Sequence, residues 1–76
     1  MPRFNFHILD DEGMSRDEEG SELPDIDAAR REAKASARDL ITQYMKNRAP
    51  VTGQKLQIVD ETGEVLEIMD VRDVLN

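Results

Sequence analysis

Cysteine and tryptophan are missing from this sequence of 76 residues, and aromatic residues make up only 4% of it. Without cysteine the chain can form neither a disulfide nor a thiolate zinc site. Its only aromatic residues are Phe4, Phe6 and Tyr44, so the core must be thin and mostly aliphatic. We therefore expect one small compact domain over residues 1–76, with modest stability.

Long apolar runs are also missing. No run approaches the roughly 20 apolar residues that a membrane-spanning helix needs. The first residues, MPRFNFHI, alternate like a strand and lack the regions of a signal peptide. We therefore expect a cytoplasmic protein without a membrane partner.

Positive charge is scarce: 10 lysine and arginine residues face 17 aspartate and glutamate residues, and the net charge is −7. The acidic excess lies in residues 1–27 and 49–76, whereas residues 28–48 are net positive. A globally acidic chain repels phosphate backbones, so a nucleic-acid partner is not expected. Four basic side chains of the middle segment are interpreted as neutralising nearby acids rather than binding nucleic acid or lipid. They are Arg30, Arg31, Lys34 and Arg38.

The first regular element is a strand predicted at residues 3–9, where apolar and polar residues alternate. Phe4, Phe6 and Ile8 share one face of it. The strand stops at DDEG, and the stretch HILDDEG repeats the pattern of QIVDETG later in the chain. We therefore expect residues 14–17 to return as a short, polar edge strand.

Residues 54–70 are predicted to form a hairpin around the three-residue loop Glu61-Thr62-Gly63. Glycine in the last loop position suits the left-handed conformation that such a turn requires. The register expected from this loop places four apolar residues on one face. It pairs Asp60 with Glu64, Ile58 with Leu66, and Leu56 with Ile68.

Residues 25–47 are predicted to form a helix, with Asp25 as its N-cap and Asn47 near its end. Small and large apolar residues recur at spacings of three and four, which predicts a buried stripe. The stripe consists of Ile26, Ala29, Ala33, Ala37, Leu40 and Tyr44. Its alanines let the helix lie close to a sheet, and the larger residues at its ends are expected to supply most of the burial.

These elements predict an α+β fold in the order β-β-α-β-β. One helix packs on one face of an antiparallel, four-stranded sheet, because an amphipathic helix and a half-buried sheet can bury their apolar sides against each other. The short tail at 71–76 is expected to fold back over part of the uncovered face.

Five stretches of the sequence, MPRFNFH, RDEEG, SELPD, DAARREA and DETGEVL, with a terminal DVL, together resemble a family of small bacterial domains of unknown function. Members of that family look like M-P-R-[YF]-x-F-H, then D-x-E-G-x-E-L-P-D, then a helix that opens with x-x-E-A-A-R-x-E-A. The chain departs from the pattern at Asn5 and Asp27. The resemblance covers nearly the whole chain. It implies the fold class and a compact, free-standing domain, but no activity.

His7, the only histidine, is the first candidate for chemistry. A lone histidine can act as a general base, a proton switch or a metal ligand. A catalytic role requires an oriented partner, however, and the sequence contains no recognisable nucleophile motif. We interpret His7 as a surface or cross-strand residue, and we expect no catalytic residue, no cofactor and no enzyme activity.

The acidic run near the N-terminus is the candidate for a hard cation such as calcium. It comprises Asp10, Asp11, Glu12, Asp17, Glu18, Glu19, Glu22 and Asp25. A calcium loop of the EF-hand type needs glycine at its sixth position, where Ser15 stands if the loop starts at Asp10. We therefore assign no metal ligand, and interpret the acids as a solvated loop that keeps the edge strand from pairing with other chains.

The uncovered face of the sheet is the main candidate for function. His7, Leu9, Val59, Val65 and Met69 are expected to lie there, where a cluster of apolar residues would mark the surface for a protein partner or a homodimer. We therefore expect a small binding or regulatory module that acts through protein–protein contacts. Two alternatives stay open: a metal-dependent or accessory enzyme component that uses His7 and nearby carboxylates, and an acidic mimic of nucleic acid.

Overall fold

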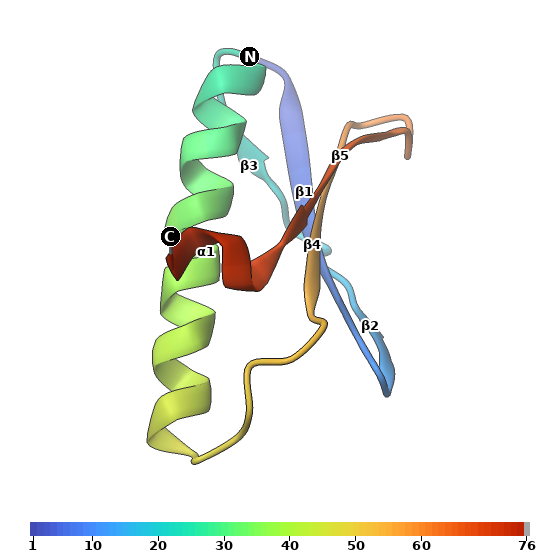
Figure 1. The fold of residues 1–76 in the computed structure, drawn as a ribbon. Coiled ribbons are helices and arrows are strands. Elements are labelled where there is room, and N and C mark those ends of the chain that lie inside the picture. Colours follow the sequence, from blue (N-terminus) through green and yellow to red (C-terminus); the bar gives the residue numbers. More distant parts are fainter. Residues whose placement is uncertain (76) are drawn as a thin grey trace.

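The computed structural model describes residues 1–75 and consists of one sheet, one long helix and one short helix (Figure 1). In chain order the elements are β1 (Arg3–Asp10), β2 (Gly13–Ser15), β3 (Ser21–Glu22), α1 (Ile26–Lys46), β4 (Lys55–Val59), β5 (Val65–Asp70) and the 3-10 helix η1 (Val71–Leu75). All strand pairs are antiparallel, in the order β2-β1-β4-β5. β3 pairs with β1 on the same edge as β2.

The α+β class and the helix on one face of the sheet are confirmed. In Figure 1, α1 lies along one side of the sheet, and no described element covers the opposite side, which we call the outer face. The sheet has a fifth strand, because the pair Ser21–Glu22 hydrogen-bonds with Arg3 and Phe4. Two residues are too short to produce an alternating pattern. The edge strand also ends at Ser15, earlier than the expected 14–17.

Both ends of α1 follow from local chemistry. Asp25 is the N-cap, and its Oδ1 accepts a hydrogen bond from the N–H of Ala28 at 2.8 Å. At the other end Asn47 is the C-cap, and Arg48 follows with a positive φ of 58°. A residue in the left-handed conformation turns the chain out of the helix. The expected bounds of 25–47 therefore include the helix and its two caps.

The core lies between the alanine stripe of α1 and the inner side of the sheet. Ala29, Ala33 and Ala37 are fully buried there, with Leu56 and Ile58 of β4 in the same cluster. Small side chains let the two layers approach closely, so the larger residues of β4 fill the space between them.

The large residue buried near the end of the helix is Ile41, and not Leu40 or Tyr44 as expected. Steps of four from Ala29 through Ala33 and Ala37 lead to Ile41. The stripe therefore keeps a spacing of four to its end, while the expected spacing changed to three. Leu40 is only partly buried against the core.

The register expected for the β4–β5 hairpin is correct at the turn and wrong beyond it. The N–H of Asp60 donates to the carbonyl of Glu64 at 3.0 Å, and Val59 pairs with Val65. A bulge then places Ile58 opposite Glu67 and Leu56 opposite Met69. The extra residue is Leu66, and it reverses the faces of the rest of β5.

The C-terminal segment packs on the helix side of the molecule and does not cover the outer face. Figure 1 shows η1 crossing from the end of β5 to the middle of α1. Val71 is fully buried in the core, and Val74 packs against the same cluster. Within the expected tail at 71–76, residues 71–75 therefore form a short 3-10 helix that packs against the core. Asn76 lies outside the described residues.

Candidate interaction site

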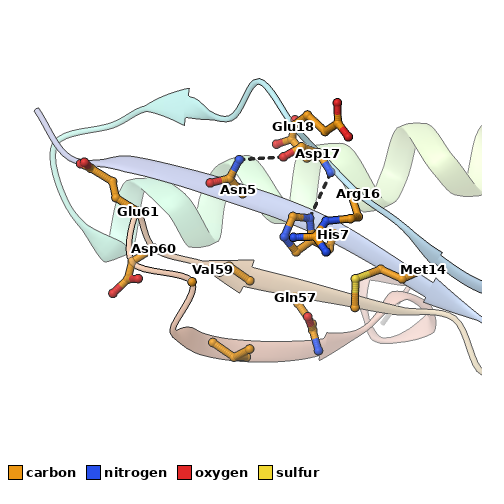
Figure 2. A pocket seen from close by; sticks show the side chains of 12 residues that line it. Asn5, His7, Met14, Arg16, Asp17, Glu18, Gln57, Val59, Asp60 and Glu61 are labelled. Atoms are coloured by element: carbon orange, nitrogen blue, oxygen red, sulfur yellow. Dashed lines mark hydrogen bonds between the residues drawn. The ribbon is translucent and has the colours of Figure 1, made fainter.

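A groove of about 760 Å³ runs over the outer face of the sheet. Its floor is formed by side chains of β1, β4 and β5, which alternate in direction along each strand. Figure 2 shows His7 near its centre, the residues after β2 along one side, and the β4–β5 turn with Asp60 and Glu61 at one end. The floor consists of Asn5, His7, Gln57, Val59 and Val65.

One wall of the groove is the segment between β2 and β3, which is held by Asp17. Both strands pair with the same edge of β1, and the chain bows outward between them. The carboxylate of Asp17 fills the gap: Oδ2 accepts from the N–H of Phe6 at 3.1 Å, and Oδ1 accepts from the N–H of Gly20 at 3.2 Å. A side chain thus replaces the strand that would satisfy the backbone of β1.

The main chain of Asp17 is bound as well. Its carbonyl accepts from Nδ2 of Asn5 at 2.7 Å, and its N–H donates to Nδ1 of His7 at 3.0 Å (Figure 2). Gly20 closes the segment with a φ of 71°, and a Cβ there would lie 2.9 Å from the carbonyl oxygen of Phe4. These contacts fix the wall of the groove against β1.

His7 is buried, with only 8% of its surface exposed, and it pairs with Gln57 across the strands. Of the two expected positions, surface or cross-strand, it therefore has the second. The bowed segment covers it, and this cover comes from a part of the chain ten residues away. A backbone N–H can only donate, so Nδ1 must be the unprotonated nitrogen of the ring. The ring proton therefore lies on Nε2, which has no hydrogen-bond partner among residues 1–75 and is not among their fully buried atoms.

β5 carries three exposed apolar side chains beside the groove. Val65 is 44% exposed, Leu66 is 41% exposed and Ile68 is 57% exposed. The exposure of Ile68 results from the bulge, which places Ile68 opposite Gln57, on the outer face, and turns Met69 inward against the core. Met69 was expected on the outer face, and that expectation is wrong. Sequence analysis missed Ile68 because simple alternation cannot detect a bulge.

The inward side of β5 is tied to the helix. Glu67 accepts a hydrogen bond from Nε of Arg30 at 2.9 Å, and Arg30 also pairs with Asp27. The hydrogen bond and the charge of Glu67 raise the pKa of Arg30, so the guanidinium stays charged. This bridge favours the orientation in which Ile68 points away from the core.

The β4–β5 turn is stabilised by the carboxylate of Asp60. Its Oδ1 accepts from the hydroxyl and the N–H of Thr62 and from the N–H of Glu64, at 2.6, 2.9 and 3.0 Å. The hydroxyl of Thr62 is the main cause that lowers the pKa of Asp60 below its usual value, and the backbone N–H groups add to it. The turn at the end of the groove is thus built on a charged side chain.

We expect Asp60→Asn to make the stability of the domain less sensitive to acid. Because the folded state lowers the pKa of Asp60, its stabilisation is present above the ordinary value of 3.8 and disappears as the pH falls through the lowered value. Asparagine keeps an acceptor but cannot titrate. The difference in Tm between the wild type and Asp60→Asn should therefore narrow as the pH falls below 3.8. A constant difference over the whole pH series would contradict this role.

The acidic run does not form a ligand set. Within residues 1–75, no three His, Asp or Glu side chains form a group that could hold a metal ion. Asp17 uses both oxygens on backbone N–H groups, and Asp10 accepts from the N–H of Glu12. The groove is lined by His7 with its free N–H donor, by the amide side chains of Asn5 and Gln57, and by apolar side chains, with carboxylates at its rim.

Comparison with known proteins identifies a family. A family model described as "Domain of unknown function (DUF6894)" matches residues 3–72. Neither the curated proteins nor the solved structures include a match to this chain. Over the described residues, no helix has the length and apolar character to cross a membrane.

Proposed function

The chain belongs to the DUF6894 family, whose function is not known, and we propose that it is a small cytoplasmic protein-binding module. It engages its partner through the outer face of the sheet and the free edge of β5. The observation that carries the proposal is the concentration of exposed apolar side chains on this one strand: Val65, Leu66 and Ile68. Exposed apolar side chains that cluster on a small domain are typical of an interaction surface.

The backbone of β5 supports the same surface. β5 lies at the end of the sheet order, and the N–H of Val71 donates to the carbonyl of Gln54 on the β4 side. In an antiparallel ladder the direction of these groups alternates, so the N–H and C=O of Ile68 point away from β4. An extended segment of another protein can add to such an edge by main-chain hydrogen bonds, with side-chain contacts providing specificity.

The proposed surface keeps four of the five residues expected from the sequence, His7, Leu9, Val59 and Val65, and exchanges Met69 for Ile68. A binding role also suits the chemistry of the site better than a catalytic one, because Nδ1 of His7 is already occupied by the backbone. A general base needs a free lone pair facing its substrate.

Ile68→Lys tests the proposal, and Met45→Lys is its matched control. Met45 is 71% exposed and lies on α1, away from the sheet. We expect Ile68→Lys to lower the recovery of specifically bound proteins at least about tenfold in quantitative affinity capture from the native cell. Met45→Lys should leave recovery unchanged, and both variants should keep the Tm of the wild type. Equal recovery with Ile68→Lys would overturn the proposal.

Sedimentation measurements distinguish whether the partner is a second copy of this chain or a different protein. If the outer face joins two copies of the chain, the wild type should dimerise with increasing concentration and Val65→Glu should remain monomeric. If the partner is another protein, wild type and variant should both sediment as monomers while capture depends on Ile68.

A further inference from the structure

We propose that the groove on the outer face binds an extended segment of a partner protein that carries lysine or arginine side chains. This inference rests on the proposed function and adds the chemical class of the partner. It depends on three independent features of the groove: the charge of its rim, the free donor of His7, and the arrangement of apolar and polar side chains on its floor.

The rim of the groove is acidic. Asp17, Glu18, Asp60 and Glu61 line it, against the single base Arg16. None of the four acids forms an ion pair with a lysine or arginine of residues 1–75, whereas acids elsewhere in the fold do. Together with a net charge of −7, this rim attracts a cationic segment and repels an anionic one.

The floor presents a donor that no described residue uses. His7 is more than nine-tenths buried, its orientation is fixed by the N–H of Asp17, and the protonated Nε2 is left without a partner among residues 1–75. Because the ring is buried and its orientation is fixed, while Nε2 itself is accessible, an acceptor brought by a ligand can pair with this donor without reordering the side chain. In a peptide, the acceptor present at every residue is the backbone carbonyl.

The same floor suits an extended chain. Val65 is 44% exposed and pairs with the buried Val59, so it forms an apolar patch beside the polar side chains of Gln57 and Asn5. A peptide in the β conformation directs alternate side chains to opposite sides. An apolar side chain of the peptide can then pack on Val65 while the lysines or arginines on either side of it reach the acidic rim.

A second copy of this chain does not supply such a segment. Five of its ten lysine and arginine residues lie on α1, where the backbone is helical. The two that lie in strands, Arg3 and Lys55, form ion pairs with Glu22 and Asp70 of their own chain. The hairpin that carries the exposed apolar residues is acidic at Glu61, so two copies would bring like charges together.

The test uses two synthetic peptides and ¹⁵N-labelled protein. One peptide alternates lysine and valine, and its matched control alternates glutamate and valine; both have blocked ends. We expect the lysine peptide to shift the amide resonances of His7, Gln57, Val59 and Val65, with affinity that falls as salt is added. The glutamate peptide should leave them unmoved.

Three variants test whether the lysine peptide binds in the groove. Glu18→Lys reverses a charge at the rim and should weaken the lysine peptide about fivefold. Glu32→Lys makes the same change on the exposed side of α1 and should have no effect. His7→Asn keeps an acceptor near the position of Nδ1 but removes the Nε2 donor, and it should weaken the peptide about fivefold while the protein stays folded.

Four results would overturn the inference. Shifts spread over the whole surface, or equal weakening by Glu18→Lys and Glu32→Lys, would show general attraction of charges. No binding of the lysine peptide, or equal binding of both peptides, would show that the groove does not select a segment with lysine or arginine side chains. If capture still depends on Ile68 in that case, the proposed function survives without it; if capture is independent of Ile68, the proposed function fails as well.

Discussion

Ala33→Glu is expected to abolish the cooperative unfolding transition of this domain. Ala33 is fully buried in the middle of the stripe, with Leu56 and Ile58 in the same core cluster. A glutamate side chain there would either separate the helix from the sheet or bury an unpaired carboxylate. An uncompensated buried charge costs about 3–5 kcal/mol, and a domain of this size has roughly that much stability in total.

Thermal and urea unfolding followed by circular dichroism would measure this effect. Ala35→Glu is the matched control, because it makes the same substitution two residues away on the exposed side of α1. Glutamate has a good helix propensity, so Ala35→Glu should change the stability by only a few tenths of a kcal/mol. If Ala33→Glu unfolds with the same midpoint as Ala35→Glu, the alanine stripe does not face the sheet.

The helix and its packing could be predicted from the sequence because they depend on local signals. Asp25 has the side chain of an N-cap, and the alanines recur with the period of a helix. Both signals are contained in neighbouring residues, so no tertiary contact had to be known. The burial of Ile41 was missed because Leu40 and Ile41 are both large and apolar. Only the spacing of four residues that the structure shows after Ala37 distinguishes them.

The outer face could be predicted less well because it depends on contacts between distant residues. The bulge at Leu66 cannot be predicted from the alternation of apolar and polar residues in the sequence. It nevertheless determines that Ile68 is exposed and that Met69 packs against the core. His7 was placed on the correct face, but its burial depends on a loop whose path the composition does not reveal. A run of acids predicts a solvated loop, and nothing in it distinguishes Asp17 from Glu18.

That distinction can be tested, since Asp17→Ala is expected to lower the free energy of unfolding by about 2 kcal/mol. The substitution removes the acceptor for the N–H groups of Phe6 and Gly20, which then lack a partner in a partly buried site. For a domain of this size the loss corresponds to a fall in Tm of roughly 10 °C. Asp17→Asn keeps one carbonyl acceptor and should lose about half as much.

Glu18→Ala is the control for this substitution, because it removes the same charge from the neighbouring, exposed position. Its Tm should stay close to that of the wild type, since surface charges without a bonded partner contribute little. Hydrogen exchange gives the local result: the amides of Phe6 and Gly20 should lose protection in Asp17→Ala and keep it in Glu18→Ala. Equal losses in the two variants would mean that the acidic run acts through its total charge. An effect confined to Asp17 would instead show that one carboxylate replaces a missing strand, and that the wall of the groove depends on it.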